Sequence, residues 1–219
     1  MTPPITPAWE RLLEVSALVL GIVNGLMLLR LYLRDRAKLR VEPVHPDVYQ
    51  WWIRLPPGEN GGKPTRRFGF LCYVGIANSG LRNVTMDSWR LHLRTQGGKN
   101  TELRALSIPE PERSFSGGTK AWPVLGVRGL HYSGETIVAS GGSISGFAYY
   151  LYECYGHESW NPRMDNERIH ARFYVTSVFG QRASCEISFR ELRLDEAKSM
   201  VSEIDRIGVD SFLEEPPTD

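Results

Sequence analysis

The sequence predicts an all-β domain, an antiparallel sandwich, between one apolar N-terminal helix and one short C-terminal helix. Two observations predict the sandwich. Between residues 41 and 190, about seven or eight segments alternate apolar and polar residues as half-buried strands do. Clusters of Gly, Pro and Ser separate these segments, and no long stretch of helical periodicity lies between them. Short strands joined by turns, without crossover helices, favour two packed antiparallel sheets.

The N-terminal helix is predicted from an uncharged run. Residues 15–29 carry no charged side chain, and apolar flanks extend the run to residues 12–33. At about 1.5 Å per residue, this length crosses the roughly 30 Å hydrocarbon core of a bilayer. A cleaved signal peptide is disfavoured, because the chain start is not basic and no A-x-A site follows the run. A buried core helix stays an alternative, because fifteen uncharged residues alone are short for a span.

The flanks of the span predict its anchors and its orientation. Trp9 and Tyr32 are spaced to lie at the two membrane interfaces. One basic residue, Arg11, precedes the span, and the basic residues that follow it are Arg30, Arg34, Arg36, Lys38 and Arg40. The positive-inside rule therefore places the N-terminus outside the cell membrane and the large domain in the cytoplasm. The basic segment is also expected to contact lipid headgroups.

Small residues on one face of the span predict pairing of two helices. Ala17, Gly21 and Gly25 recur every four residues, and Asn24 lies near the same face. Such a stripe lets two helix backbones approach closely in lipid, and an amide there can bond across the contact. We therefore expect a homodimer formed through this helix.

Composition divides the chain into five parts. They are a short tail (residues 1–11), the transmembrane helix (12–33), a basic juxtamembrane segment (34–40), the β-sandwich domain (41–190), and a C-terminal helix with a disordered tail (191–219). In the last part Met200, Val201, Ile204 and Ile207 share one helical face, and Asp195 is placed to cap the helix start. We expect this amphipathic helix to pack on its own domain.

Several strands can be placed in the β domain. In "RRFGFLCYVGIA", alternate residues from Phe68 to Ile76 are apolar, and "NSG" then makes a turn. "LRNVTMDSWRLHL" follows as the expected partner strand, and a one-residue shift of its apolar phase predicts a β-bulge. "ISGFAYYLY" is a further strand. The alternating residues 169–175 and 183–189, joined by "FGQR", predict a hairpin.

Parts of this pattern resemble known β-sandwich proteins. "VGIANSGLRNVTMDSWRLHL" resembles the opening strands of bacterial immunoglobulin-like domains, and "ASGGSISGF" and "FYVTSVFGQRASCEISF" resemble their closing strands. The resemblance covers roughly two thirds of the chain, and the Cys and Trp spacing of antibody domains is absent. It implies a membrane-anchored immunoglobulin-like sandwich, and fold-level analogy implies little about function.

The sequence argues against several classes of function. A net charge of +1 gives no global field for nucleic acid, so no nucleic-acid partner is expected. Three cysteines, Cys72, Cys154 and Cys185, form no paired framework and suit a reducing compartment. "GENGGKPT" lacks the spacing and the helix of a phosphate-binding loop, and no G-x-S-x-G elbow occurs. We expect no cofactor, no metal site and no catalytic residues.

The segment 153–170 is the best candidate for a binding loop. It is long for a hairpin connection, and long loops are often functional. Its aromatic and basic side chains, the types that binding surfaces favour, are Tyr155, His157, Trp160, Arg163 and Arg168. A loop that only covers one end of the sandwich is the structural alternative.

These observations favour a single-pass, non-catalytic binding or scaffolding protein that presents its β domain in the cytoplasm to an unknown protein partner. Two alternatives stay open. One is an extracytoplasmic domain that binds an envelope component. The other is a metal- or thiol-dependent enzyme that uses Cys154, His157 and His170, because Cys154 and His157 have the spacing of half a zinc site.

Overall fold

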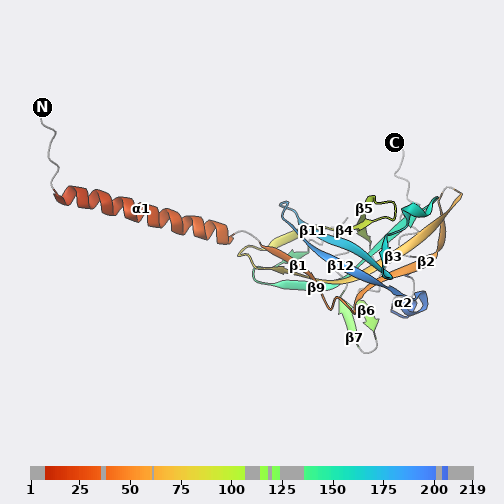
Figure 1. Cartoon of the computed structure of the whole chain (residues 1–219). Helices are drawn as coiled ribbons and strands as arrows, with labels where there is room; N and C mark the ends of the chain where they lie inside the picture. The colour runs from red at the N-terminus through yellow and green to blue at the C-terminus, as the bar shows by residue number, and fades with distance from the viewer. Residues whose placement is uncertain are drawn as a thin grey trace, which may run out of the picture.

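The structure, a computed structural model, describes residues 8–35, 38–60, 62–106, 114–117, 120–123, 136–200 and 204–206. One long helix, α1 (Ala8–Asp35), projects from one end of a β-barrel (Figure 1). The strands are β1 (Leu39–Pro43), β2 (Gln50–Asn60), β3 (Lys63–Asn78), β4 (Val84–Arg94), β5 (Asn100–Leu106), β6 (Ser114–Gly117), β7 (Lys120–Pro123), β8 (Ile137–Val138), β9 (Ser143–Cys154), β10 (Met164–Asp165), β11 (Arg168–Ser177) and β12 (Arg182–Leu192). A 3₁₀ turn, η2 (Glu158–Trp160), follows β9, and a short helix, α2 (Leu194–Met200), follows β12.

Seven strands close into a barrel. Their order is β11, β12, β2, β3, β9, β5 and β4, and β4 pairs again with β11. The pairs are antiparallel except β12 with β2, which is parallel. Strand directions cannot alternate all the way round a ring with an odd number of strands, so one parallel pair is required.

The predicted sandwich is therefore wrong, and the immunoglobulin-like fold is wrong with it. A sandwich consists of two sheets with free edges. Here β11 has a partner on each side, β12 through residues 168–176 and β4 through residues 171–177, so the sheet has closed on itself. Closure leaves the seven barrel strands without an open edge. Alternation of apolar and polar residues is the same in a barrel strand and in a sandwich strand, which is why the sequence pattern did not distinguish them.

The placement of β4 is a second correction. It was expected to pair with β3, but it pairs with β11, β5 and β8, and the link at residues 79–83 crosses one end of the barrel. The predicted bulge in β4 is confirmed. Thr176 lies opposite Ser88, whereas Ser177 lies opposite Met86, so Asp87 is the extra residue.

The barrel interior is filled by the side chains that the alternation marked as apolar. Residues Phe68, Phe70, Cys72, Val74 and Ile76 of β3 are all buried in it. The predicted hairpin is present as β11 and β12, and its inward residues Ile169, Phe173, Val175, Ile187 and Phe189 join the same cluster. The ring of Phe189 meets that of Phe70 edge-on, with centroids 5.3 Å apart.

A second apolar cluster lies outside the barrel, over β2, β3 and β9. Trp51 and Trp52 face opposite sides of β2, and both are buried, Trp52 inside the barrel and Trp51 in the outer cluster. Ala197 of α2 and Ile204 cover the outer cluster and are fully or almost fully buried. The C-terminal segment therefore packs on its own domain, as predicted.

The C-terminal helix is shorter than the sequence predicted. It ends at Met200, and residues 204–206 form a turn. Asp195 lies inside its first turn rather than before it, and its carboxylate lies 3.7 Å from Arg193. Of the predicted helix and tail after Met200, only residues 204–206 are described, so Val201 and Ile207 lie outside the described residues.

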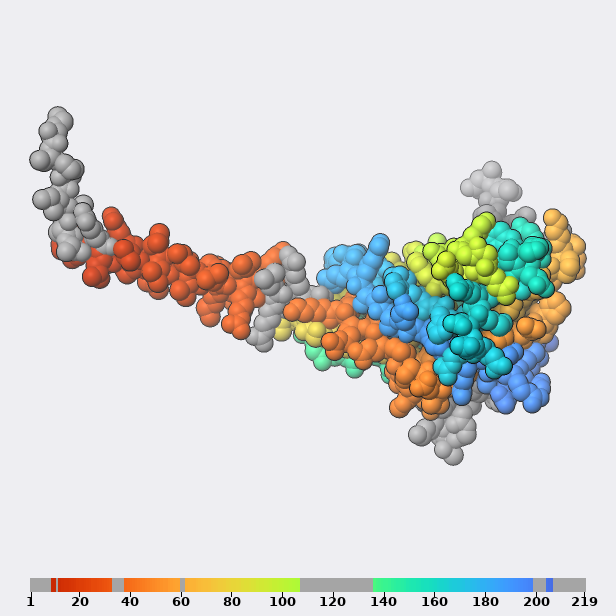
Figure 2. Space-filling model, in the orientation of Figure 1, coloured from red at the N-terminus to blue at the C-terminus, as the bar shows by residue number. Residues whose placement is uncertain are grey.

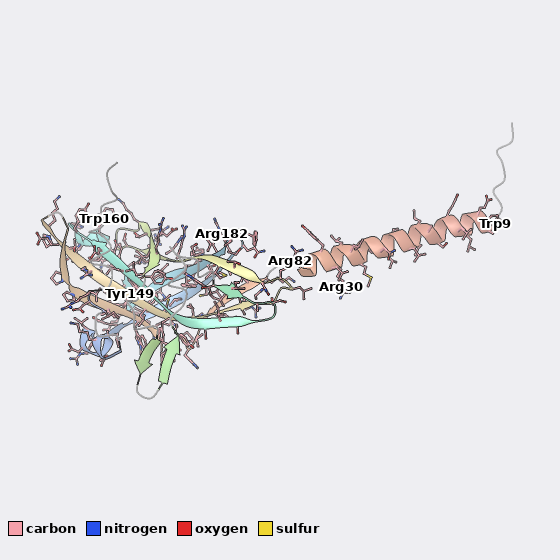
Figure 3. The ribbon with its side chains drawn as sticks, turned by 180° about the vertical axis from the view of Figure 1, so that it is seen from behind. Trp9, Arg30, Arg82, Tyr149, Trp160 and Arg182 are labelled. Carbon is pink, nitrogen blue, oxygen red and sulfur yellow. The ribbon has the colours of Figure 1, made fainter. Side chains whose placement is uncertain are left out.

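The barrel has two distinct ends. We call the end where β1 begins, next to α1, the near end, and the opposite end the far end. Asn78, Val84, Ser143, Ser177 and Arg182 mark the near end, because they start or finish the strands that reach it. Arg82 and Arg182 lie toward the helix and Trp160 at the opposite end of the barrel (Figure 3).

Candidate functional site

The surface of α1 is apolar and uncovered in the described structure. Its stretch Leu12–Tyr32, 21 residues with a mean hydropathy of 2.2, has no buried residue. The large apolar side chains of this stretch are 51–71% exposed. Figure 2 shows the helix standing clear of the barrel. The helix is thus long and apolar enough to span a membrane, and a continuous apolar surface of this size requires a lipid or protein cover.

The two predicted aromatic anchors are exposed side chains of α1. Trp9 and Tyr32 are 62% and 60% exposed, near the two ends of the apolar stretch. Arg30 lies near the C-terminal end of α1, on the barrel side (Figure 3). Their contact with membrane interfaces stays a prediction.

The basic segment after the span is described in part. Lys38 and Arg40 are exposed at the near end, and the Nε atom of Arg40 lies 3.8 Å from a carboxylate oxygen of Glu42. Arg36 and the side chain of Arg34 lie outside the described residues. The described part of the basic segment thus lies where the barrel begins.

The predicted pairing stripe is open on the helix surface. Ala17, Gly21, Asn24 and Gly25 are exposed, and a Cβ atom added at either glycine would meet nothing within 4 Å. The stripe is free to receive a second helix, and pairing stays a prediction.

The segment at residues 155–163, which we call the far loop, is fastened across the far end. The guanidinium group of Arg66 donates to Oδ1 of Asn161 at 2.7 Å and to the carbonyl oxygens of Gly156 and His157 at 3.0 Å. Backbone N–H groups of the β4–β5 turn donate to two of its carbonyl groups at 2.7 and 2.8 Å. The loop therefore has one arrangement against the barrel end.

Two aromatic rings of the far loop face solvent. Trp160 is 41% exposed, and Nζ of Lys99 lies 4.2 Å from its ring centroid. Tyr155 is 60% exposed, with Nζ of Lys63 5.9 Å from its ring centroid. Exposed aromatic rings beside cations are typical of surfaces that bind protein partners.

The five predicted binding residues do not form one site. Arg163 lines a pocket on the barrel side, described next. Nδ1 of His157 accepts from the N–H of Ser159 and so caps η2. Arg168 lies 3.6 Å from a carboxylate oxygen of Asp47. Tyr155, Trp160 and His157 belong to the far end, whereas Arg163 leads into the pocket.

A pocket of about 490 Å³ lies on the outer barrel surface, over β4, β11 and β12 near the far end, and we call it the outer pocket. It is lined by His92, Leu93, Arg94, Asn100, Arg163, Asp165, His170, Ala171, Arg172, Tyr174 and Glu186. These residues converge because β11 closes the barrel against β4. Ala171 lies opposite Leu93, and Arg172 lies opposite both His92 and Glu186.

Two glutamate side chains contact two of the basic residues of the pocket, Arg172 and His92. Nε of Arg172 donates to a carboxylate oxygen of Glu186 at 3.0 Å. Nε2 of His92 lies 2.9 Å from a carboxylate oxygen of Glu102, which Arg90 also contacts. Burial raises the pKa of Glu102, but the hydrogen bonds and charges of Arg90 and His92 outweigh that effect, so its pKa lies below the ordinary value.

The remaining basic residues of the pocket are Arg94, Arg163 and His170. Within the part of the chain that the structure describes, no hydrogen bond or ion pair involves the side chains of Arg94, Arg163 or His170. The backbones of Arg94 and Arg163 are joined by an N–H···O bond of 2.8 Å, so both residues have fixed positions. Two unpaired guanidinium groups on a rigid frame suit a ligand with an acidic group.

The residues of the proposed thiol or metal enzyme do not come together. The thiol of Cys154 is buried and lies 3.6 Å from Oδ1 of Asn161, whereas His157 bonds to the backbone of Ser159. Burial raises the pKa of Cys154, the opposite of what a nucleophilic thiolate needs. Among the described residues, no three His, Cys, Asp or Glu side chains form a group able to hold a metal ion.

Most of the pocket was not predicted. Its lining comes mainly from β4, β5, β11 and β12, which are far apart in the sequence, and only Arg163, Asp165 and His170 lie in the predicted loop, residues 153–170. The available signal was the polar phase of β4 and β11, in which His92, Arg94, His170 and Arg172 alternate with apolar residues. That phase marks an outer face, but it does not show which two strands are neighbours.

Comparisons with known proteins identify no family. No protein-family model and no curated protein sequence matches the chain. Similar solved structures include a Northeast Structural Genomics Consortium target, SoR45, with 10% identity over 71% of this chain and 85% of that one and a TM-score of 0.28. A second is described as the putative ApaA protein from Bordetella pertussis, with 13% identity over 71% of this chain and 93% of that one and a TM-score of 0.28. A third is the archaellum periplasmic stator protein complex FlaF and FlaG from Sulfolobus acidocaldarius, with 11% identity over 62% of this chain and 87% of that one and a TM-score of 0.27. Similarity at these scores carries no argument about fold or function.

Proposed function

We propose that this protein is a non-catalytic binding module, held at the cell membrane by α1, that captures an acidic segment of a partner protein in the outer pocket. The observation that carries the proposal is the pair of unpaired guanidinium groups of Arg94 and Arg163 on the rigid far end. The exposed rings of Trp160 and Tyr155 lie on the far loop, which runs into the pocket through Arg163. Arg, Trp and Tyr together are the side chains that contribute most to protein interfaces.

A binding assay tests this proposal. The full chain in nanodiscs of phosphatidylcholine, which adds no net anionic charge, is titrated against fluorescein-labelled hexaglutamate at low ionic strength. We expect Arg94→Gln and Arg163→Gln each to weaken binding at least about tenfold, because each charge-assisted hydrogen bond contributes roughly 1.5–3 kcal/mol. Salt should weaken binding as well.

A matched control is available on the same barrel face. Arg104 is exposed on β5, opposite Arg90 and outside the pocket, so Arg104→Gln removes the same charge from a nearby position. It should change binding by less than about twofold, since a single exposed charge contributes little. Equal losses from all three substitutions would show non-specific attraction and would contradict a site at the pocket.

We further propose that the N-terminus lies outside and the barrel in the cytoplasm. The basic residues at positions 30–40 support this orientation through the positive-inside rule, and three free cysteines suit a reducing compartment. C-terminal fusions to green fluorescent protein and to alkaline phosphatase should give fluorescence without phosphatase activity. Phosphatase activity without fluorescence would instead support the extracytoplasmic alternative, with the pocket facing envelope ligands.

Pairing of two copies through α1 is the remaining part of the proposal. The open surface at Gly21 and Gly25 supports it, because a small-residue face permits close helix approach in lipid. Gly21→Leu should abolish the signal of a membrane two-hybrid assay, whereas Leu20→Ala, on another face, should leave it within about twofold. An unchanged signal from Gly21→Leu would contradict pairing at this stripe.

A further inference from the structure

The near end of the barrel carries its own exposed apolar side chains. Phe179, at the tip of the β11–β12 hairpin, is 81% exposed, the highest value among the large apolar side chains of the described barrel residues. Val178 beside it is 55% exposed, and Leu81, in the link between β3 and β4, is 48% exposed. We call these three side chains the apolar tip. Side chains of this kind exposed together at one end of a domain mark a surface that contacts something.

Basic residues lie in the turns that carry the apolar tip or next to them. Arg82 follows Leu81, Arg182 is the first residue of β12 after the hairpin tip, and Lys38 is exposed where its carbonyl oxygen accepts from the N–H of Ser79. Among the described side chains of β1, β4 and these turns, the acidic ones are Glu42, which lies near Arg40, and the exposed Asp87. Apolar side chains ringed by cations are the combination by which protein surfaces enter the headgroup layer of an anionic bilayer.

The chain connection brings this surface to the membrane. The apolar stretch of α1 ends at Tyr32 and the helix at Asp35, and the carbonyl oxygen of Lys38 accepts from the N–H of Ser79, at 2.9 Å. The path from Tyr32 to Lys38 spans at most about 15 Å, with three helical steps and three extended ones. The headgroup layer is itself roughly 5–8 Å thick on each side. The near end is therefore held within reach of the bilayer, whatever angle α1 makes with the barrel.

Hydrogen bonds hold the backbone of the turns at the near end. Asn78 is 1% exposed, and its side chain joins the backbones of Lys38, Gly80, Arg82, Val138 and Ala139. Val178 donates from its N–H to the carbonyl oxygen of Thr85, which fixes the hairpin tip to β4. Figure 3 shows Arg82 and Arg182 toward the helix and away from the far end.

We propose that the near end of the barrel docks on the anionic lipid surface of the bilayer that α1 spans, with Phe179, Val178 and Leu81 among the headgroups and Lys38, Arg82 and Arg182 against lipid phosphates. Docking rests on the proposed membrane anchorage. It does not depend on what the outer pocket binds or on which side of the membrane the barrel lies. It fixes the barrel upright, so that the far loop and the outer pocket point away from the bilayer toward a partner.

The test measures how deep the near end lies in lipid. The full chain is placed in nanodiscs of phosphatidylcholine with phosphatidylglycerol, and an NBD fluorophore is attached through Ser79→Cys at the near end. Matched chains carry the fluorophore through Glu158→Cys at the far end or Val19→Cys in α1. Cys72 and Cys154 are buried and Cys185 is half-buried, which favours labelling at the introduced thiol. Nitroxide-labelled lipid quenches the fluorophore on contact.

We expect strong quenching at positions 19 and 79 and little at position 158. The quenching at position 79 gives the ratio of docked to undocked barrel. Phe179→Ser should reduce this ratio about ten- to hundredfold, because it removes one aromatic side chain that docking buries in lipid. Val48→Ser, which removes a 45% exposed side chain in the β1–β2 link, should leave it unchanged. Arg82→Gln with Arg182→Gln should weaken quenching in the anionic nanodiscs, and pure phosphatidylcholine should weaken it for the native chain.

The outcomes separate the two proposals. Quenching at position 19 without quenching at position 79 would overturn docking and leave the anchor intact. Absence of quenching at position 19 would overturn the membrane anchor itself. Quenching at position 79 that Phe179→Ser leaves unchanged would also overturn docking, because the signal would then come only from the short tether.

Discussion

Replacing Phe189 by alanine is expected to lower the stability of the barrel strongly. Phe189 is fully buried in β12, and its ring packs edge-on against that of Phe70. Truncation of a buried phenylalanine lowers the free energy of unfolding by about 3–5 kcal/mol, because the lost transfer energy adds to the cost of the cavity. Domains of this size are stable by roughly 5–15 kcal/mol, so the variant should unfold at a much lower urea concentration. The fluorescence of buried Trp51, Trp52 and Trp89, followed in the full chain in micelles, reports the transition.

Phe179→Ala is the matched control for this prediction. The substitution is chemically the same and lies ten residues earlier, but its side chain is exposed at the hairpin tip. Its free energy of unfolding should change by no more than about 0.5 kcal/mol, as for other surface positions. If Phe189→Ala and Phe179→Ala unfolded at the same urea concentration, β12 would have the opposite face inward, and the register of the closed barrel would be wrong.

The strands of this fold were predictable because each carries its own periodicity. The alternation from Phe68 to Ile76 and that of the β11–β12 hairpin depend only on which face is buried, and both were placed correctly. The bulge at Asp87 was predictable for the same reason, because it shifts the apolar phase of β4 by one residue. Local pattern is enough wherever a property is settled within one strand.

The closure of the barrel was not predictable from these patterns. It depends on the pairing of β11 with β4, two strands about 80 residues apart, and both have an apolar inner face that would serve equally well in a sandwich. The outer pocket depends on the same pairing, since His92 and Arg172 become neighbours only across it. The predicted loop, residues 153–170, is longer than the far loop, because its ends belong to β9, β10 and β11. Arg66, which fastens the far loop, lies some 90 residues earlier.

The long apolar helix was predictable because its requirement is compositional. A span needs only a sufficient length of apolar residues, and residues 12–33 supply it. The apolar tip was not found, because Leu81, Val178 and Phe179 lie in two separate turns and neither turn is apolar overall. The strand order brings these turns to one end of the barrel, the end at which α1 joins it.

Replacing Asn78 by alanine is expected to loosen the whole near end. The Oδ1 atom of Asn78 accepts from the N–H groups of Lys38 at 3.4 Å and Gly80 at 3.0 Å. Its Nδ2 donates to the carbonyl oxygens of Arg82 at 2.6 Å and of Val138 and Ala139 at 3.3 Å. Removing the amide leaves several of these groups without a partner, at a cost of roughly 1–3 kcal/mol for each one that stays buried. We expect a loss of about 2–4 kcal/mol in urea unfolding.

Two further variants decide whether hydrogen bonding is the cause. Asn78→Asp has almost the same shape, but it places a second acceptor oxygen against three carbonyl groups, so it should be at least as destabilising as Asn78→Ala. Asn83→Ala removes one exposed hydrogen bond, in which the N–H of Ser140 donates to Oδ1 of Asn83. It should lower the free energy of unfolding by about 0.5–1.5 kcal/mol. Hydrogen exchange should speed up at residues 79–83 and 138–140 in both Asn78 variants and stay slow in β12. A stable Asn78→Asp variant would mean that the side chain only fills space and that other contacts hold the turn of Leu81 in place.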